Sequence, residues 1–246
     1  MPLYKVDGTL ISESPYNGKT MSILGASYDL VNSNYGVTST GIWWYKVCQA
    51  LGMTINTNNS VSGSTVCGDP SGSSAGCGTR ATSLDNGTAP DVIMVTVGGN
   101  DFSKEKGIGS YDGSQTFPTD GSTFREAYAI MMKKIMETYP LAEVWCQTRP
   151  YIYENNGAVE FPEKNDNGVL FKVWNETIVD MARLFGAGIV RLDECGMTWF
   201  NRSTYGGDYN SGTGKVLHPN NKGHSLIANQ VIKTIDPACQ TRYSAS

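Results

Sequence analysis

The sequence predicts an α/β protein, built as a three-layer α/β/α sandwich around a central parallel sheet of five strands. Short apolar runs of strand length alternate along the chain with longer amphipathic stretches of helical spacing. Strands that alternate with helices give a parallel sheet covered on both faces. The length of 246 residues is ordinary for one α/β domain, and no linker long enough to separate two domains interrupts the pattern.

The five expected strands are apolar runs bounded by turn-forming residues. The first ends at Gly25, and the others are expected at residues 53–57, 92–97, 142–148 and 188–192.

Four helices are expected between and after these strands. An amphipathic segment covers residues 41–51, and a capping box at 123–126 opens a helix whose apolar stripe continues until Pro140. Two further helices are expected at 169–185 and 222–235.

The expected domain organisation is an amino-terminal arm or hairpin over residues 1–18, with a turn at Val6–Thr9, followed by a single domain over 19–240. The three long loops should gather near the catalytic edge of the sheet, and they cover residues 58–90, 101–121 and 149–167.

Ser27 follows the first strand in a Gly-x-Ser arrangement, Gly25-Ala26-Ser27. The crevice outside the carboxyl ends of parallel strands is where ligands bind, so a serine there is a candidate nucleophile. The alternative is a serine that only caps the next helix.

Three further segments favour the first interpretation. They are a glycine turn at 59–64, a strand end at 95–101 with the sequence Gly-Gly-Asn-Asp, and Leu-His-Pro-Asn at 217–220. Each of the first two segments alone is also an ordinary turn. In this order and together with Ser27, they resemble the SGNH family of serine esterases and lipases, also called GDSL hydrolases.

The resemblance implies a flavodoxin-like SGNH hydrolase fold over nearly the whole chain and a role for four residues. Ser27 matches the nucleophile, and His218 matches the general base. Gly63 and Asn100 match the oxyanion-hole donors, together with the backbone N–H of Ser27.

The chemistry of the residue types agrees with these roles. An imidazole can take the proton of a serine hydroxyl and return it to a leaving group. Of the two histidines, His218 precedes Pro219, which disfavours helix, whereas His224 opens the last helix and is expected to pack or cap there.

The chain departs from the family pattern at two positions. Ala26 stands where an acidic residue is usual, and Lys215 stands where the family has the aspartate that orients the imidazole. Lysine cannot accept the imidazole N–H. Either Asp208 or a backbone carbonyl must orient His218. Asp208 is expected in a flexible, glycine-rich loop, which favours the carbonyl and gives a Ser-His dyad.

Six cysteines are present, and a disulfide is an open alternative only for Cys67 with Cys77, which flank a Gly/Ser-rich loop. Cys146, in an expected strand, is predicted to be a small buried side chain. No Cys-x-x-Cys motif or histidine cluster indicates a metal site, and no cofactor is expected.

The net charge of −4 and the pI of about 5.2 give no basic surface for nucleic acid. No apolar run is long enough to span a membrane. The amino terminus lacks the apolar region of a signal peptide, which does not exclude secretion. We expect a soluble protein, with a preference for an extracellular or surface-associated location.

The predicted function is hydrolysis of carboxylic esters through an acyl-enzyme, with short acyl groups such as acetyl, on a small molecule or a glycan. Aromatic residues in and near the loops suit sugar faces, although Trp43 and Trp44 are expected in the core: Tyr28, Trp43, Trp44, Tyr111, Tyr151, Tyr153, Trp199 and Tyr209. One alternative is a glycan-binding or structural module with a degenerate hydrolase site. Another is a lipase or thioesterase for longer acyl chains.

Overall fold

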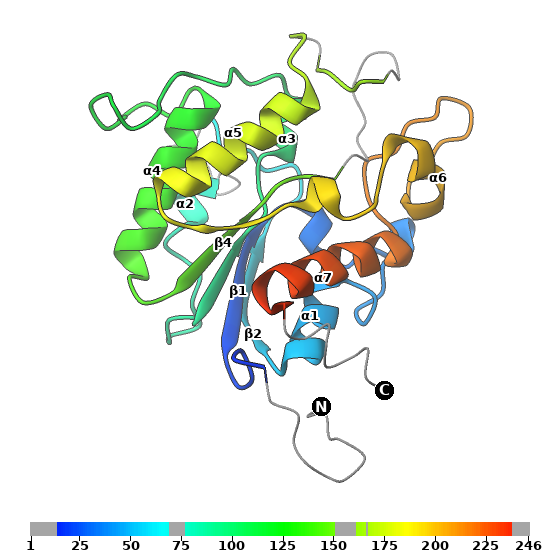
Figure 1. The fold of residues 1–246 in the computed structure, drawn as a ribbon, viewed down its shortest axis with the longest axis horizontal. Coiled ribbons are helices and arrows are strands. Elements are labelled where there is room, and N and C mark those ends of the chain that lie inside the picture. Colours follow the sequence, from blue (N-terminus) through cyan, green and yellow to red (C-terminus); the bar gives the residue numbers. More distant parts are fainter. Residues whose placement is uncertain (1–13, 69–76, 151–160, 166, 238–246) are drawn as a thin grey trace.

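Five parallel strands form the central sheet, in the order β2-β1-β3-β4-β5 (Figure 1). The computed structural model describes residues 14–68, 77–150, 161–165 and 167–237. The expected turn at Val6–Thr9 lies outside these residues. The strands are β1 (Thr20–Gly25), β2 (Thr54–Ser60), β3 (Val92–Val95), β4 (Glu143–Gln147) and β5 (Gly188–Val190).

Helices cover both faces of the sheet, which confirms the predicted three-layer α/β/α architecture (Figure 1). One layer holds α1 (Trp43–Leu51) and α7 (Asn221–Ile235), and the other holds α2 (Cys77–Arg80), α4 (Phe124–Thr138) and α5 (Phe171–Leu184). Shorter elements lie in the connections along the chain: α3 (Gly99–Ser103), α6 (Arg202–Tyr205) and the 3-10 turns η1 (Ser27–Asp29), η2 (Ser33–Tyr35), η3 (Leu192–Glu194) and η4 (Trp199–Asn201).

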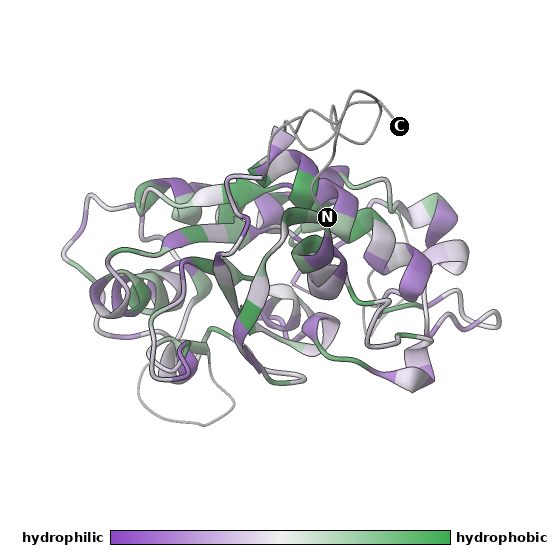
Figure 2. Cartoon of the chain, turned by 90° about the horizontal axis from the view of Figure 1, so that it is seen from below, coloured by the Kyte–Doolittle hydropathy of each residue, from purple (hydrophilic) through white to green (hydrophobic). Residues whose placement is uncertain are grey.

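The apolar strands divide their side chains between two hydrophobic cores. In β3, Ile93 and Val95 enter the core under α4 and α5, whereas Val92 and Met94 enter the core under α1 and α7. Successive strand residues point to opposite faces, so a strand buried on both sides needs an uninterrupted apolar run. Figure 2 shows hydrophobic residues concentrated toward the centre of the fold and hydrophilic ones toward its periphery.

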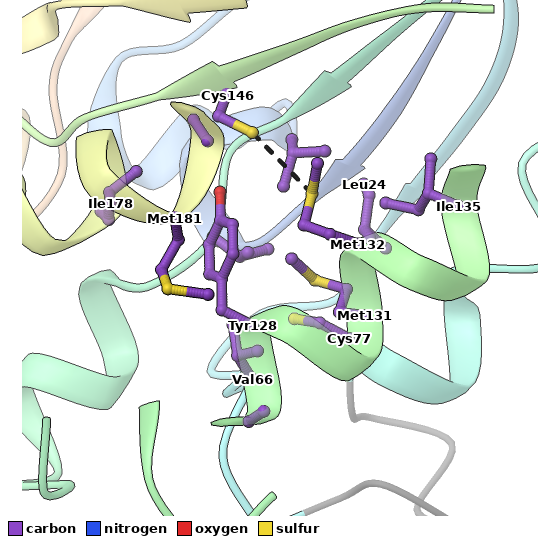
Figure 3. Close-up of a cluster of buried hydrophobic side chains, with 14 of the residues drawn as sticks. Leu24, Val66, Cys77, Tyr128, Met131, Met132, Ile135, Cys146, Ile178 and Met181 are labelled. Atoms are coloured by element: carbon purple, nitrogen blue, oxygen red, sulfur yellow. Dashed lines mark hydrogen bonds between the residues drawn. The ribbon is translucent and has the colours of Figure 1, made fainter. Parts of the chain in front are cut away.

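Sulfur-containing and aromatic side chains fill much of the core under α4 and α5 (Figure 3). Tyr128 and Met132 of α4 point toward β4, where the Cys146 Sγ lies 3.9 Å from the Met132 Sδ. Cys146 is fully buried, as predicted.

The boundaries of β2 differ most from the prediction. The strand extends to Ser60, three residues beyond the expected end, because Asn58, Asn59 and Ser60 pair with the last residues of β1. β2 is the edge strand and is largely polar, so the pairing with β1, and not an apolar pattern, determines its length.

The disulfide considered for Cys67 and Cys77 is not formed, because both are free buried thiols. The segment before the Gly/Ser-rich stretch is ordered by other contacts. The N–H groups of Val66 and Cys67 bind the Asp101 carboxylate, and the Gly68 N–H donates to the Gly121 carbonyl at 2.7 Å. The five cysteines of the described residues are all free.

None of the helices in the described part of the chain has both the length and the apolar character needed to cross a membrane.

Gly98 forms the sharp turn between β3 and α3, and its conformation requires glycine. Its φ of 110° and ψ of −17° are sterically unfavourable for other residues. An added Cβ would also lie 3.0 Å from the Phe124 ring and 3.3 Å from Ile178. The Trp174 indole donates to the Gly98 carbonyl at 3.0 Å, which fixes the turn from the opposite side.

We predict that Gly98→Ala lowers the free energy of unfolding by about 2 kcal/mol or more, since backbone strain and the Phe124 contact act together. Chemical denaturation measures the change. Gly186→Ala is the matched control, because Gly186 has a φ of 68° but nothing within 4 Å of an added Cβ, so only about 1 kcal/mol is expected. Equal losses in the two variants would contradict the packing argument.

Candidate active site

The four residues singled out from the sequence lie around the carboxyl edge of the sheet. Ser27 opens η1 directly after β1, Gly63 follows β2, and Asn100 lies in α3 after β3. His218 comes from the loop before α7. Because parallel strands end at the same edge of the sheet, residues that are distant in sequence meet there.

Ser27 and His218 are in hydrogen-bonding contact. The His218 Nε2 lies 2.9 Å from the Ser27 Oγ. The histidine is only 8 % exposed, so its ring has few alternative positions. The distance lies in the range over which a base can accept the proton of a hydroxyl nucleophile.

Asp208 orients His218, and the preference for a backbone carbonyl was wrong. The Asp208 Oδ2 lies 2.7 Å from the His218 Nδ1, while its Oδ1 accepts the backbone N–H groups of Leu217 and His218, each at 2.9 Å. Burial raises the pKa of Asp208, but hydrogen bonds from the ring and backbone of His218 outweigh it and hold the pKa below its ordinary value.

The glycine-rich loop around Asp208 is held by backbone hydrogen bonds, which is why the expectation of a flexible loop failed. The Gly207 N–H donates to the His218 carbonyl at 2.7 Å, and the Asn210 N–H donates to the Lys215 carbonyl at 2.9 Å. The two sides of the loop therefore pair with each other. This pairing places Asp208 opposite His218. An aspartate at position 215 is therefore not needed to orient the imidazole.

Two tyrosines hold the imidazole ring and its segment. The Tyr35 ring stacks on His218 with 4.1 Å between the ring centroids and 7° between the planes. Tyr28 packs at 5.8 Å from the His218 ring, and its hydroxyl donates to the Leu217 carbonyl. No sequence signal marks Tyr35, because an aromatic residue in a polar loop is not distinctive.

Asn100 and Gly63 belong to one hydrogen-bonded unit. The Asn100 Nδ2 donates to the Ser64 carbonyl at 2.9 Å, and the Lys104 Nζ donates to the Gly63 carbonyl at 2.7 Å. The amide of Asn100 has a second N–H for another acceptor. Among the described residues, no acceptor pairs with the Gly63 N–H.

A buried carboxylate, Asp29, lies beneath the candidate nucleophile. Its Oδ2 accepts the Ala26 N–H at 2.9 Å and the Thr96 hydroxyl at 2.6 Å, and its Oδ1 accepts the Trp43 indole N–H at 2.9 Å. Burial raises the pKa of Asp29 above its ordinary value, and these hydrogen bonds and the charge of Arg149 oppose that shift only in part. The carboxylate thus connects the ends of β1 and β3 with α1.

A second buried carboxylate, Asp101, connects α3 with the segment that follows Gly63. Its carboxylate accepts the N–H groups of Val66 and Cys67 at 2.8 to 3.0 Å, and it is fully buried. Burial raises the pKa of this carboxyl, and the two backbone donors oppose that shift. The segment that follows Gly63 is therefore attached to the residue next to Asn100.

A small cleft opens beside the Ser27 hydroxyl. It is lined by Ala26, Ser27, Tyr28, Thr96, Gly99, Asn100, Arg149, Phe171 and Leu217. Arg149 and Phe171 were not predicted to belong to the site, because an arginine after a strand and an aromatic at a helix start are common features. Ser27 and Asn100 share this cleft.

The remaining predicted residues lie away from the cleft lining. His224 is 1 % exposed and packs within α7, as expected, and burial lowers its pKa to about 3. Trp43 is buried, as predicted, and Trp44 is half-buried. Tyr151 and Tyr153 lie outside the described residues. Within those residues, no cluster of three His, Cys, Asp or Glu could hold a metal ion.

The sequence model of the GDSL-like lipase/acylhydrolase family matches residues 28–156, about half of the chain. The chain belongs to this family. It is a carboxylic ester hydrolase by that membership. No curated protein has a significant match to the sequence.

Several solved structures share the fold. A protein from Bacteroides ovatus assigned as a GDSL-like lipase is 22% identical, with a TM-score of 0.62 over 87% of this chain and 96% of its own. A Lactobacillus plantarum protein is 21% identical, with a TM-score of 0.71 over 90% and 98%. An active-site mutant of a family two carbohydrate esterase from Clostridium thermocellum is 17% identical, with a TM-score of 0.55 over 92% of this chain and 65% of its own.

Glu163, before α5, is a buried carboxyl with no hydrogen-bond partner for either oxygen among the described residues. Burial raises its pKa to about 8, and the charge of Arg202 opposes this only in part. Because the folded-state pKa lies above the unfolded value, the folded state binds more protons between these values, and stability falls as pH rises through this range.

We predict that Glu163→Gln raises the Tm at pH 9 relative to the original protein, and that this advantage shrinks as the pH falls toward 4.5. Glutamine removes the charge that the buried position disfavours at high pH. Thermal unfolding across this pH range measures the effect, with the exposed Glu137→Gln as a control for losing one negative charge. A Tm difference between Glu163→Gln and the original protein that does not change with pH would contradict the raised pKa of Glu163.

Proposed function

We propose that this GDSL-like hydrolase is a serine esterase that cleaves short acyl esters, acetyl esters above all, on carbohydrate, through an acyl-enzyme. Ser27 is the nucleophile, His218 the general base, and Asp208 the carboxylate that orients it. The observation that carries the proposal is the continuous contact from the Ser27 Oγ to His218 to Asp208, at 2.9 and 2.7 Å.

The first half of the reaction forms the acyl-enzyme. As the Ser27 Oγ bonds to the carbonyl carbon, its proton passes to the His218 Nε2. Negative charge then develops on the carbonyl oxygen, where the Asn100 amide and the N–H groups of Gly63 and Ser27 donate. The C–O bond to the alcohol breaks next, and the alcohol leaves with the proton that His218 held.

The second half releases the acid. A water molecule gives a proton to His218 and bonds to the acyl carbon, and the same donors bind the oxygen as it becomes charged again. The bond to the Ser27 Oγ then breaks, and the serine recovers its proton from His218. Asp208 remains ionised throughout and stabilises the imidazolium that forms in each half. A depressed pKa keeps this carboxyl charged at neutral pH.

The preference for short acyl groups on a glycan rests on the cleft and on similar folds. Tyr28, Phe171 and Leu217 border the cleft close to Ser27, which favours a small acyl group. An acetyl xylan esterase and family two carbohydrate esterases are among the proteins of similar fold. The contact of Asp208 with His218 argues against a module with a degenerate site, because the imidazole has a carboxylate partner although Lys215 stands at the family's aspartate position.

We predict that Ser27→Ala abolishes hydrolysis of a chromogenic acetate ester and that His218→Ala has nearly the same effect. When nucleophile and base act as a unit, removing either costs about as much as removing both. Rates are compared with those of the original protein, and thermal unfolding checks that both variants fold. A Ser27→Ala protein that keeps more than about a hundredth of the activity would indicate another nucleophile, because losses of about 10⁶ occur in such units.

Asp208→Asn should lower turnover by several orders of magnitude, about 10⁴ in the well-studied serine proteases, because the amide cannot stabilise the imidazolium. The rate should recover partly at high pH. The measurement is a pH profile of turnover for Asp208→Asn beside Lys215→Ala, which removes the residue at the family's aspartate position and should keep nearly full activity. If Lys215→Ala loses turnover and Asp208→Asn does not, Asp208 is not the carboxylate that orients His218.

Asn100→Ala should lower the turnover number by about 10² or more, or 2.7–4 kcal/mol of transition-state stabilisation, with little change in the Michaelis constant. Its amide is proposed to meet the oxygen only once charge develops there. Steady-state kinetics on a soluble ester separate the two constants. An increased Michaelis constant with normal turnover would mean that Asn100 binds the substrate in its ground state.

A further inference from the structure

Arg149 is a buried cation in the cleft that the reaction described above does not use. It follows β4 and is 6 % exposed, and it lines the same cleft as Ser27 and Asn100. Charged side chains are costly to bury unless a partner compensates them. The groups that surround the Arg149 guanidinium therefore indicate which kind of ligand the cleft favours.

The arginine is held in one position by contacts on several sides. Its Nη1 donates to the Thr96 carbonyl at 3.0 Å, and its Cζ lies 3.8 Å from the centre of the Tyr28 ring. The backbone N–H and carbonyl of Arg149 both bind the Asn175 side chain, at 2.9 Å each. A Cβ at position 99 would lie 3.0 Å from the Arg149 Nε, so Gly99 leaves space for the guanidinium.

These contacts fix the guanidinium but do not pair it directly with a carboxylate. In the part of the chain that the structure describes, no carboxylate forms an ion pair with Arg149. Asp29 is near enough for Arg149 to lower its pKa. However, the Asp29 oxygens already accept hydrogen bonds from Ala26, Thr96 and Trp43. The charge of Asp29 therefore acts on Arg149 only from a distance, and the guanidinium borders the cleft without a direct carboxylate contact among the described residues.

A guanidinium in this position favours a carboxylate as its ligand. Its planar N–H groups match the two oxygens of a carboxylate, and the pairing is stronger where water is excluded.

We propose that Arg149 makes the site selective for esters that carry a carboxylate close to the scissile bond. The inference rests on the proposed function, since it requires that the cleft beside Ser27 is where esters bind. The carboxylate belongs either to the acyl group, as in the half-ester of a dicarboxylic acid, or to the alcohol, as in an acetylated uronic acid.

Two pairs of substrates distinguish these sources, each pair differing only in the charge. Monoethyl succinate is compared with its uncharged amide, ethyl succinamate, and acetylated galacturonic acid is compared with its uncharged methyl ester. Released ethanol and acetate are followed by NMR. At low ionic strength, the charged member of one pair should have a kcat/KM at least ten-fold higher, and the pair that shows this identifies the source.

Substitutions of Arg149 test whether this side chain causes the preference for charged esters. Arg149→Gln should reduce the ratio of kcat/KM between charged and uncharged members at least ten-fold, chiefly through a higher KM for the charged ester. Arg149→Lys should retain part of the ratio, because it keeps the charge without the planar fork. Arg183→Gln is the matched control. It removes a positive charge from an exposed position on α5 and should leave the ratio unchanged.

Equal kcat/KM for both members of both pairs in the original protein would overturn the inference. So would an Arg149→Gln protein that loses activity equally on charged and uncharged esters, because the arginine would then only support the structure. If Arg149→Gln does not fold, competitive inhibition of the original protein decides. Succinate or galacturonate must inhibit at least ten-fold more strongly than its uncharged counterpart.

Failure of the inference is distinct from failure of the proposed function. An active esterase without a preference for charged esters contradicts the role of Arg149 alone. Activity that persists in Ser27→Ala contradicts the proposed function itself.

Discussion

The site depends on one buried carboxylate, Asp29, which binds the ends of two central strands to each other. Through Ala26 and Thr96 it connects the residues that follow β1 with those that follow β3, and through the Trp43 indole it connects both to α1. Its backbone carbonyl also accepts the Trp44 indole N–H and the Asn58 side chain, at 3.0 and 2.8 Å, which adds β2. Buried polar networks in which every member is satisfied are rigid. Ser27, two residues before Asp29, is therefore presented on a fixed support.

Asp101 and Asp208 apply the same principle to the rest of the site. Each carboxylate binds two successive backbone N–H groups, those of Val66 and Cys67 or those of Leu217 and His218. Loops that carry functional residues gain a defined geometry in this way, because an acid accepts several donors at once. The parallel sheet brings the strand ends together, and the three aspartates determine how the loops beyond those ends are placed.

The fold and the four motif residues could be predicted from the sequence, because apolar periodicity and short motifs are local signals. The positioning contacts could not. Asp29 and Tyr35 act largely through distant partners, Thr96 and Trp43 for the first and His218 for the second, and nothing in their own segments marks them. The sequence offers Asp208 as a candidate, but its neighbouring glycines indicate a flexible loop when the pairing across the loop is not known. Arg149 was missed for a similar reason: its significance lies in the absence of an ion-pair partner among the described residues, which only the arrangement in space reveals.

The central claim is that Ser27 is a nucleophile activated by His218, and covalent labelling tests it most directly. A fluorophosphonate reacts with an activated serine and leaves a stable adduct that peptide mass spectrometry can locate. We expect a single adduct on the peptide that contains Ser27, no adduct in Ser27→Ala, and much slower labelling in His218→Ala. An adduct on another serine, or labelling of Ser27 at an unchanged rate without His218, would contradict the account.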